Sequence, residues 1–208
     1  MSKKILVACE ESQTVCNAFR NLGFEAFSCD IQECSGGHPE YHIKSDVRDI
    51  LNLVEWDLII AHPPCTYMSR AGARWLYKDH QLQPERYKKL LAAKEFFMLF
   101  YNHPCKRICI ENPTPFKIVE LPPYSQAIQP YQFGAPYSKR TLLWLKNLPK
   151  LKPTNIINEH QPYLPSTCSA FKRGESKGSY GVGKNSKEYS KTFEGIAQAM
   201  AEQWGILL

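Results

Sequence analysis

The sequence predicts one α/β domain built on a mainly parallel, doubly wound sheet, and three observations support this. Short apolar segments without polar alternation recur along the chain, as strands buried on both faces do. Segments with helical periodicity separate them, so strands and helices alternate. Several apolar segments end at an acidic residue or at proline, and the carboxyl ends of strands are where open α/β sheets hold their ligands.

The elements can be placed in chain order from apolar runs and helical spacing. Strands are expected at residues 3–8, 25–29, 42–45, 58–61, 107–110 and 141–145. Helices are expected at residues 15–22, 50–54, 84–102 and 192–204, the third with its aromatic side chains in the core. Ser12 or Thr14 is the expected N-cap of the first helix, and Gly23 its end.

The segment from Leu58 to Ser69 joins a buried strand to a single thiol. Pro63 and Pro64 stop the strand ladder, since proline has no N–H to donate and a fixed φ. Cys65 follows directly, which places it at the carboxyl edge of the sheet. We interpret it as a nucleophile held by a stiff turn; the alternative is a buried, inert cysteine beside a proline turn.

Acidic residues follow two neighbouring predicted strands. Asp30 ends the second strand and Asp46 follows the third. In a doubly wound sheet, a carboxylate at the tip of the second strand can accept both hydroxyls of a ribose, and one at the next tip an adenine amino group. Either aspartate alone is more often a turn or capping residue. The two in this order favour a cofactor that contains adenosine.

Length and composition set the domain organisation and the compartment. The 208 residues predict a single domain over 1–208, with 146–191 as a basic, loop-rich insertion and 69–80 as a candidate lid. No apolar run approaches the ~20 residues that cross a bilayer, and no signal segment is visible, so the chain is expected to be cytoplasmic without a membrane partner. The eight cysteines form no C-x-x-C pair, and no metal site is expected.

Charge is unevenly distributed along the chain. Residues 1–100 carry 12 Lys and Arg against 13 Asp and Glu, whereas residues 138–208 carry 11 against 5. A basic third on a neutral body is typical of a surface that binds a polyanion, although basic tails are also common as solvated surface.

Together these features resemble the cytosine-C5 DNA methyltransferases that use S-adenosylmethionine, over most of the chain and in the family's order. Residues 63–65 (Pro-Pro-Cys) resemble the nucleophile motif, and residues 111–112 (Glu-Asn) resemble the strand-end pair that holds the base. Residues 133–136 (Phe-Gly-Ala-Pro) and the bases after them resemble the Gly-x-Pro-Gln-x-Arg-x-Arg strand entry. The sequence departs from the family where residues 9–14 replace its glycine-rich turn and residues 137–141 keep only part of its arginine pattern. The chain is also shorter than a family catalytic core with its target-recognition domain.

The resemblance implies a Rossmann-like S-adenosylmethionine-dependent methyltransferase fold and assigns roles by motif position. The catalytic residues that it implies are Cys65, Glu111, Lys139 and Arg140. The cofactor-binding residues are Cys9, Glu10, Ser12, Gln13, Thr14, Asp30, Ile31, Asp46, Val47 and Pro63. The resemblance also implies Asn112 as a substrate-binding residue, whereas Ser69 and Arg70 of the candidate lid and Lys172 and Arg173 of the basic insertion are expected to bind substrate from their position and charge.

The chemistry agrees with these residue types. Carbon 5 of cytosine is too weak a nucleophile to attack a methyl sulfonium, whereas a thiolate added at carbon 6 converts the ring into an enamine that can. Protonation at ring nitrogen 3 relieves the resulting charge, which requires a neutral or proton-sharing Glu111. Lys139 or Arg140 would stabilise the ring oxygen O2 and the phosphates.

The sequence therefore predicts a cytosine-C5 methyltransferase that acts through a covalent cysteine adduct, with DNA as the favoured substrate. A base in duplex DNA would have to leave the stack to reach the thiol. RNA or a free nucleotide stays open as the substrate, and the oligomeric state is not predicted. Two other functions also stay open: an exocyclic amino (N4/N6) nucleic-acid methyltransferase, and a non-catalytic nucleic-acid-binding protein on the same fold.

Overall fold

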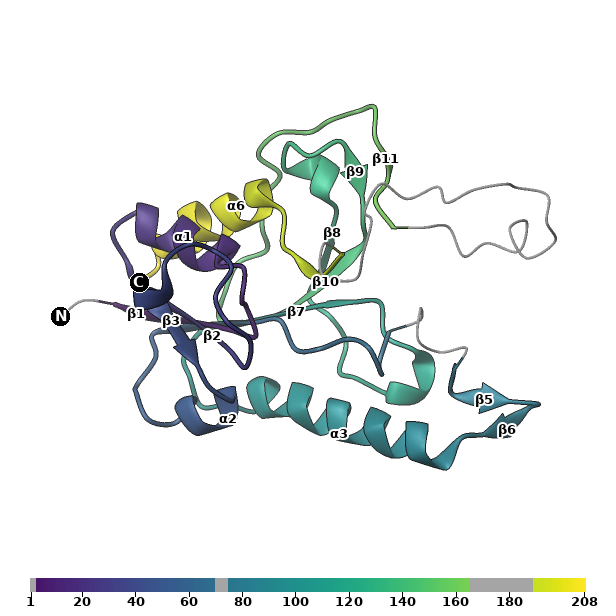
Figure 1. Cartoon of the computed structure of the whole chain (residues 1–208). Helices are drawn as coiled ribbons and strands as arrows, with labels where there is room; N and C mark the ends of the chain where they lie inside the picture. The colour runs from purple at the N-terminus through teal and green to yellow at the C-terminus, as the bar shows by residue number, and fades with distance from the viewer. Residues whose placement is uncertain (1–2, 70–74, 165–188) are drawn as a thin grey trace.

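A seven-stranded sheet forms the centre of the computed structural model, which describes residues 3–69, 75–164 and 189–208 (Figure 1). The strands lie in the order β3-β2-β1-β4-β7-β10-β8. They are β1 (Lys4–Ala8), β2 (Glu25–Asp30), β3 (His42–Lys44), β4 (Leu58–Ala61), β7 (Ile108–Pro113), β8 (Gln126–Ile128) and β10 (Thr141–Lys146). All neighbours pair in parallel except β10, which runs antiparallel to both β7 and β8. The predicted α/β class, with its mainly parallel, doubly wound Rossmann-like sheet, is confirmed.

Helices cover both faces of this sheet, as Figure 1 shows. The helices are α1 (Thr14–Asn21), α2 (Val47–Ile50), α3 (Pro84–Tyr101) and α6 (Glu194–Gly205), with 3-10 turns η1 (Pro39–Tyr41), η3 (Lys117–Val119) and η4 (Pro130–Gln132). Alternate residues of each strand face opposite layers. Ile5 and Val7 pack in one core cluster with residues of α1 and α6, and Leu6 and Ala8 pack in the other with residues of α3. The apolar runs carry no alternation because both strand faces are buried.

The expected strands and long helices are present, with differences at their ends. The second helix begins at Val47 rather than at residue 50, because the Asp46 side chain caps it by accepting from the Arg48 N–H. Strand β7 continues through Pro113, since β10 pairs with its last residues. On α3, Phe97 and Phe100 are buried but Tyr101 is exposed, so only part of its aromatic set lies in the core.

Small elements surround the two segments that the sequence singled out as irregular. β5 (Tyr77–Lys78), within the candidate lid, pairs with β6 (Gln81–Leu82), just beyond it, in a short hairpin before α3. Residues 70–74 lie outside the described part. In the basic insertion, β11 (Gln161–Pro162) pairs with β9 (Tyr137–Ser138), and residues 165–188 lie outside the described part. Among the described residues, no helix combines the length and apolar character needed to cross a membrane.

Candidate active site

The candidate site lies where the strand order reverses, at the carboxyl ends of the adjacent strands β1, β4 and β7. The parallel register pairs Ala8 of β1 with Ala61 of β4, and Ala61 with Ile110 of β7. The residues that follow these positions are therefore brought side by side. This switch point is the usual ligand crevice of an open α/β sheet.

His62 and Glu111 form a buried pair at the tips of β4 and β7. Nδ1 of His62 lies 2.8 Å from a carboxylate oxygen of Glu111, and the two side chains are 10% and 13% exposed. The pKa of Glu111 is lowered: burial opposes this, but the hydrogen bond and charge of His62 outweigh it. The pKa of His62 is raised against the opposing effect of burial, by Glu111 above all. These two directions favour an ionised Glu111 carboxylate with the shared proton on His62. Of the two predicted forms of Glu111, these pKa directions favour the proton-sharing one.

Asn112 holds the turn that carries Cys65. Its side chain is 1% exposed and donates a 2.8 Å hydrogen bond to the carbonyl of Pro63. Beyond the prolines, the Cys65 carbonyl accepts from the N–H groups of Met68 and Ser69. Hydrogen bonds therefore fix the backbone on both sides of the thiol. The Asn112 side chain is buried and supports the turn through Pro63 instead of being exposed to a ligand.

The Cys65 thiol is half-buried and lies within the electrostatic reach of Glu111 and Lys139. Burial raises its pKa first, and the Glu111 charge raises it further, whereas Lys139 lowers it. The Lys139 charge also lowers the pKa of Glu111. Arg140 lies elsewhere, because its guanidinium donates to the Tyr124 hydroxyl at 3.0 Å on an exposed surface. Of the two predicted cations, Lys139 is the one whose charge reaches the thiol, although its ammonium group donates to the Lys191 carbonyl at 3.4 Å.

The turn after β1 keeps a glycine-like shape without glycine. Cys9 and Gln13 have φ angles of 59° and 56°, in the left-handed region that glycine adopts most easily. Glu10 closes the turn, because its buried carboxylate accepts from the N–H groups of Val15 and Cys16 at 2.6 and 3.1 Å. The expected N-cap was wrong: Ser12 and Thr14 hydrogen-bond to each other, and Glu10 satisfies the first turn of α1.

The loop after β2 packs over this turn. The Gln13 side chain is fully buried and bonds to the backbone of His38 and the thiol of Cys34. Gly36 lies so close that a Cβ there would be 2.4 Å from both Gln13 Cβ and the Ser12 carbonyl. Gln13 thus positions the loop instead of facing a ligand.

The adenosine half of the predicted cofactor has suitable partners at the β2 tip. Asp30 is partly exposed and accepts one hydrogen bond from the backbone of Gln32, and the Ile31 side chain beside it is 71% exposed. An open carboxylate next to an exposed aliphatic side chain fits a ribose with an adenine stacked beside it. The Asp46 carboxylate already accepts hydrogen bonds from the Arg48 side chain, and Val47 is buried in the core. These two positions are therefore less available to bind a cofactor.

The remaining residues predicted to bind cofactor or substrate lie in different parts of the structure. Cys9 lies at the same edge, since the charges of Asp30 and Asp46 contribute to its raised pKa after burial. Pro63 is buried in the turn, and Ser69 is 8% exposed and bridges to Pro115. Arg70, Lys172 and Arg173 lie outside the described residues.

Sequence reasoning missed His62 as a site residue. It stands one position beyond the apolar run of β4, and Glu111 stands one position beyond the apolar run of β7. The signal that could have paired His62 with Glu111 is that each directly follows the apolar run of a strand, and these two strands are parallel neighbours.

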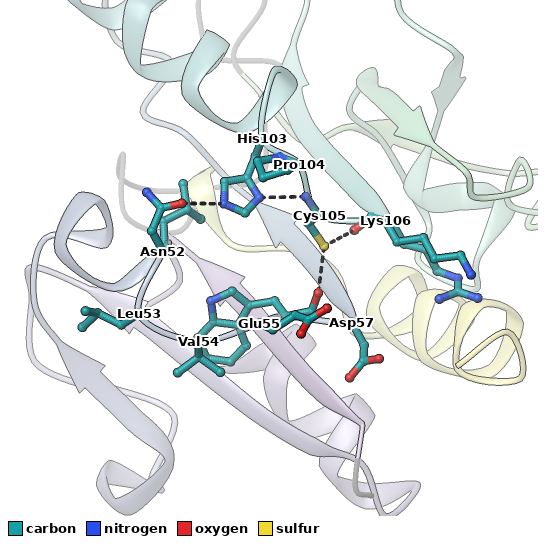
Figure 2. Close-up of a pocket in the computed structure, with 12 residues that line it drawn as sticks. Asn52, Leu53, Val54, Glu55, Asp57, His103, Pro104, Cys105 and Lys106 are labelled. Atoms are coloured by element: carbon teal, nitrogen blue, oxygen red, sulfur yellow. Dashed lines mark hydrogen bonds between the residues drawn. The ribbon is translucent and has the colours of Figure 1, made fainter.

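A cavity of about 470 Å³ lies at the opposite end of the sheet (Figure 2). Residues 51–57 and 103–107, which precede β4 and β7, line it. Its thiol, Cys105, donates to the carbonyls of Trp56 and Arg107, and its backbone N–H donates to His103. These hydrogen bonds lie within and between the two segments that precede β4 and β7. The cavity is therefore remote from the His62–Glu111 pair, which lies at the carboxyl ends of the same strands.

The cysteines are not arranged for cross-linking or metal binding in the part of the chain that the structure describes. Cys9, Cys16, Cys29, Cys34, Cys65, Cys105 and Cys109 are free thiols. The described residues contain no cluster of three or more His, Cys, Asp or Glu that could hold a metal ion.

Comparisons with known proteins find similarity among solved structures only. No family model and no curated protein matches the chain. A prophage-encoded E. coli protein described as a DNA modification methyltransferase matches at 14% identity and a TM-score of 0.48, over 75% of this chain and 52% of its own. The S. pombe Dnmt2 methyltransferase matches at 14% identity and a TM-score of 0.41, over 72% of this chain and 51% of its own. The Entamoeba histolytica methyltransferase EhMeth matches at 17% identity and a TM-score of 0.44, over 82% of this chain and 62% of its own. The chain thus spans between 51% and 62% of the length of these three.

Proposed function

We propose that this protein methylates carbon 5 of cytosine in a nucleic acid, with Cys65 as the nucleophile. The observation that carries the proposal is the placement of one half-buried thiol, on a turn held by Asn112, within the charge field of Glu111 and Lys139. A thiol, a carboxyl group and a cation are the three groups that addition to a cytosine ring requires.

Each of the three groups has a distinct task in this proposal. Cys65 loses its thiol proton and adds to carbon 6. Glu111 faces ring nitrogen 3 and the exocyclic amino group, and it supplies the proton that nitrogen 3 takes up. Lys139 stabilises the thiolate and the charge that develops on the ring, because it already lowers the pKa of both Cys65 and Glu111.

S-adenosylmethionine, when bound, would supply the electrophilic methyl group. Asp30 and Ile31 would hold its adenosine part, and Cys9 lies at the same edge of the sheet. The first turn of α1 offers fewer free N–H groups than a glycine-rich turn would, because Glu10 accepts two of them. We therefore expect the affinity to depend mainly on the β2 tip.

A nucleic acid, with DNA as the first choice, is the substrate that we propose, and the surface near the thiol suits a polyanion. Tyr67, two residues after Cys65, has Arg86 at 4.6 Å and Lys89 at 5.8 Å from its ring centre. Aromatic rings beside cations suit unstacked bases and phosphates. The formal net charge of +6 agrees with a polyanionic partner. These features would serve RNA as well, so the assay includes it.

A non-catalytic nucleic-acid-binding protein is the second candidate. The capping of α1 by Glu10 favours it, since this fills part of the turn that would otherwise face a cofactor.

Cofactor binding is tested by thermal shift with S-adenosylmethionine. Wild type should gain thermal stability by mass action, and Asp30→Ala should lose most of that gain, because a charged contact to a ribose is worth a few kcal/mol. Glu55→Ala, exposed at the opposite end of the sheet, is the control and should match wild type. Equal shifts for Asp30→Ala and wild type would remove the ribose assignment.

Methyl transfer is tested with labelled cofactor and separate pools of DNA, RNA and nucleotides, followed by nucleoside mass analysis. The proposal expects 5-methylcytosine from DNA. N4-methylcytosine or N6-methyladenine would establish an amino methyltransferase instead. Binding of cofactor and nucleic acid without product would favour the non-catalytic candidate.

A further inference from the structure

His62 is a buried titratable group that the proposed function has not yet used. It comes directly after β4, and its backbone N–H donates to the Ala8 carbonyl of β1, which fixes its place between the β1 and β7 tips. Its ring is 10% exposed. A histidine so deeply buried would normally be neutral, because burial disfavours the charged form.

The charged groups around His62 oppose that tendency. Glu111 on the β7 side accepts from Nδ1, and Glu10 on the β1 side is a second buried carboxylate whose charge favours the imidazolium. Lys139, before β10, acts in the opposite direction. Burial raises the pKa of Glu10 itself, whereas the pKa of Glu111 is lowered, so Glu111 is the carboxylate that most favours a proton on His62.

The second ring nitrogen of His62 makes no hydrogen bond to any described residue. Nε2 is buried, and among the described residues it has no hydrogen-bond partner. A histidine kept only for structure would be expected to use both nitrogens, since an unpaired buried polar atom costs roughly 1–3 kcal/mol. Within the described structure, the one hydrogen bond of the His62 ring is to Glu111, the carboxyl group that the proposed chemistry needs in protonated form.

We propose that His62 stores the proton that Glu111 delivers to ring nitrogen 3 of the cytosine. This inference rests on the proposed function and deepens it: His62 is a positioning residue that acts through Glu111. It also resolves a conflict, because Glu111 rests ionised beside His62 but must donate a proton when the thiolate adds.

The proton movements balance with water and the methyl donor as the only other reactants. The Cys65 thiol first loses its proton to water. As its sulfur bonds to carbon 6, the displaced electron pair moves through the ring to nitrogen 3, which takes a proton from Glu111. Glu111 takes the Nδ1 proton of His62, leaving a neutral imidazole with its proton on Nε2. Carbon 5 then takes the methyl group, whose bond to the sulfonium sulfur of the donor breaks. The carbon-5 proton leaves to water, and the Cys65 sulfur is expelled as a thiolate. The nitrogen-3 proton returns through Glu111 to His62.

The resting state is tested first, by NMR titration of the histidine rings in the protein without nucleic acid. The His62 signals are assigned by their loss in His62→Asn. We expect His62 to titrate above the ordinary histidine pKa of 6.5 and to shift downward in Glu111→Gln, which removes the charge. A His62 that titrates below 6.5, or that is unchanged in Glu111→Gln, would overturn the inference.

The reaction is tested by the pH profile of methylation in His62→Asn. Asparagine can still donate a hydrogen bond from the position of Nδ1 but stores no proton, which separates geometry from proton supply. We expect the alkaline limb to move to lower pH and the rate at pH 8 to fall about a hundredfold. His160→Asn, an exposed histidine stacked on Tyr131, is the matched control and should keep the wild-type profile.

The outcomes separate this inference from the proposed function. If wild type methylates cytosine and His62→Asn keeps its profile within threefold, the inference fails and the proposed function stands. If wild type methylates nothing, the proposed function fails, and the role of His62 toward cytosine fails with it even where its NMR titration is as expected.

Discussion

Replacing Asn112 tests whether the Cys65 turn is held from below by a single side chain. Asn112→Ala removes the hydrogen bond to Pro63 and leaves that carbonyl buried without a donor, which costs roughly 1–3 kcal/mol. Part of this is offset, because the Asn112 Oδ1 is itself buried and unpaired within the described structure. The net loss in the free energy of unfolding should therefore be about 1–2 kcal/mol.

Asn112→Asp sharpens the test because it keeps the side-chain volume. It replaces the donating nitrogen with an oxygen that faces the Pro63 carbonyl, so the bond is lost and no unpaired acceptor is removed. The loss should exceed that of Asn112→Ala, at roughly 3 kcal/mol or more, since a buried charge is added. Both variants should slow adduct formation at Cys65 by about a hundredfold, the scale on which a misplacement of 1 Å acts.

Urea unfolding followed by circular dichroism measures these losses. Asn21→Ala, at the exposed end of α1, is the control and should stay within about 0.5 kcal/mol of wild type. The reasoning would be refuted by an Asn112→Ala protein as stable as that control, or by Asn112→Asp proving more stable than Asn112→Ala.

Three further predictions follow from the same structure. Lys139→Met should move the pH profile of Cys65 alkylation to higher pH, because the lysine charge lowers the pKa of that thiol, whereas Arg140→Met should leave it unchanged; equal effects would refute the placement of the two cations. Gly36→Ala should weaken cofactor binding and lower the melting temperature more than Gly37→Ala, since only the first Cβ would collide with the 12–13 turn; the opposite order in calorimetry would contradict this. The His62–Glu111 pair should stabilise the fold most between pH 4.5 and 6.5, the ordinary pKa values of the two groups. Because the pKa of Glu111 is lowered in the fold, Glu111 contributes its full stabilisation above pH 4.5 and loses it on further acidification. Because the pKa of His62 is raised, His62 contributes its full stabilisation below pH 6.5 and loses it as the pH rises. A stability difference between wild type and His62→Asn that grows above pH 7 would count against the pair.

The sheet and its helices could be predicted because they depend on local apolar patterns. The run Leu58–Ala61 is buried at every position, so its composition alone identified a central strand. The prolines after it marked where the strand ends. In the same way, Asp30 could be placed at a strand tip without knowing the neighbours of that strand.

The contacts that shape the site could not be predicted, because they depend on register and on backbone conformation. Ser12 and Thr14 have the residue types of an N-cap, yet Glu10 reaches the first turn because Cys9 and Gln13 adopt left-handed conformations. The pairing of His62 with Glu111 required knowing that β4 and β7 are parallel neighbours. Lys139 and Arg140 are adjacent in sequence, and only the structure separates the cation whose charge reaches the thiol from the one bound to Tyr124.

The central claim is that Cys65 forms a covalent bond to carbon 6 of cytosine, and DNA containing 5-fluorocytosine tests it most directly. The fluorine cannot leave as a cation after methyl transfer, so the thioether persists and peptide mass mapping can locate it. The account predicts a stable adduct on Cys65 that requires S-adenosylmethionine, is absent in Cys65→Ser, and forms at least about a hundredfold more slowly in Glu111→Gln. An adduct on any of the other seven cysteines, or methylation of cytosine by Cys65→Ser, would contradict it.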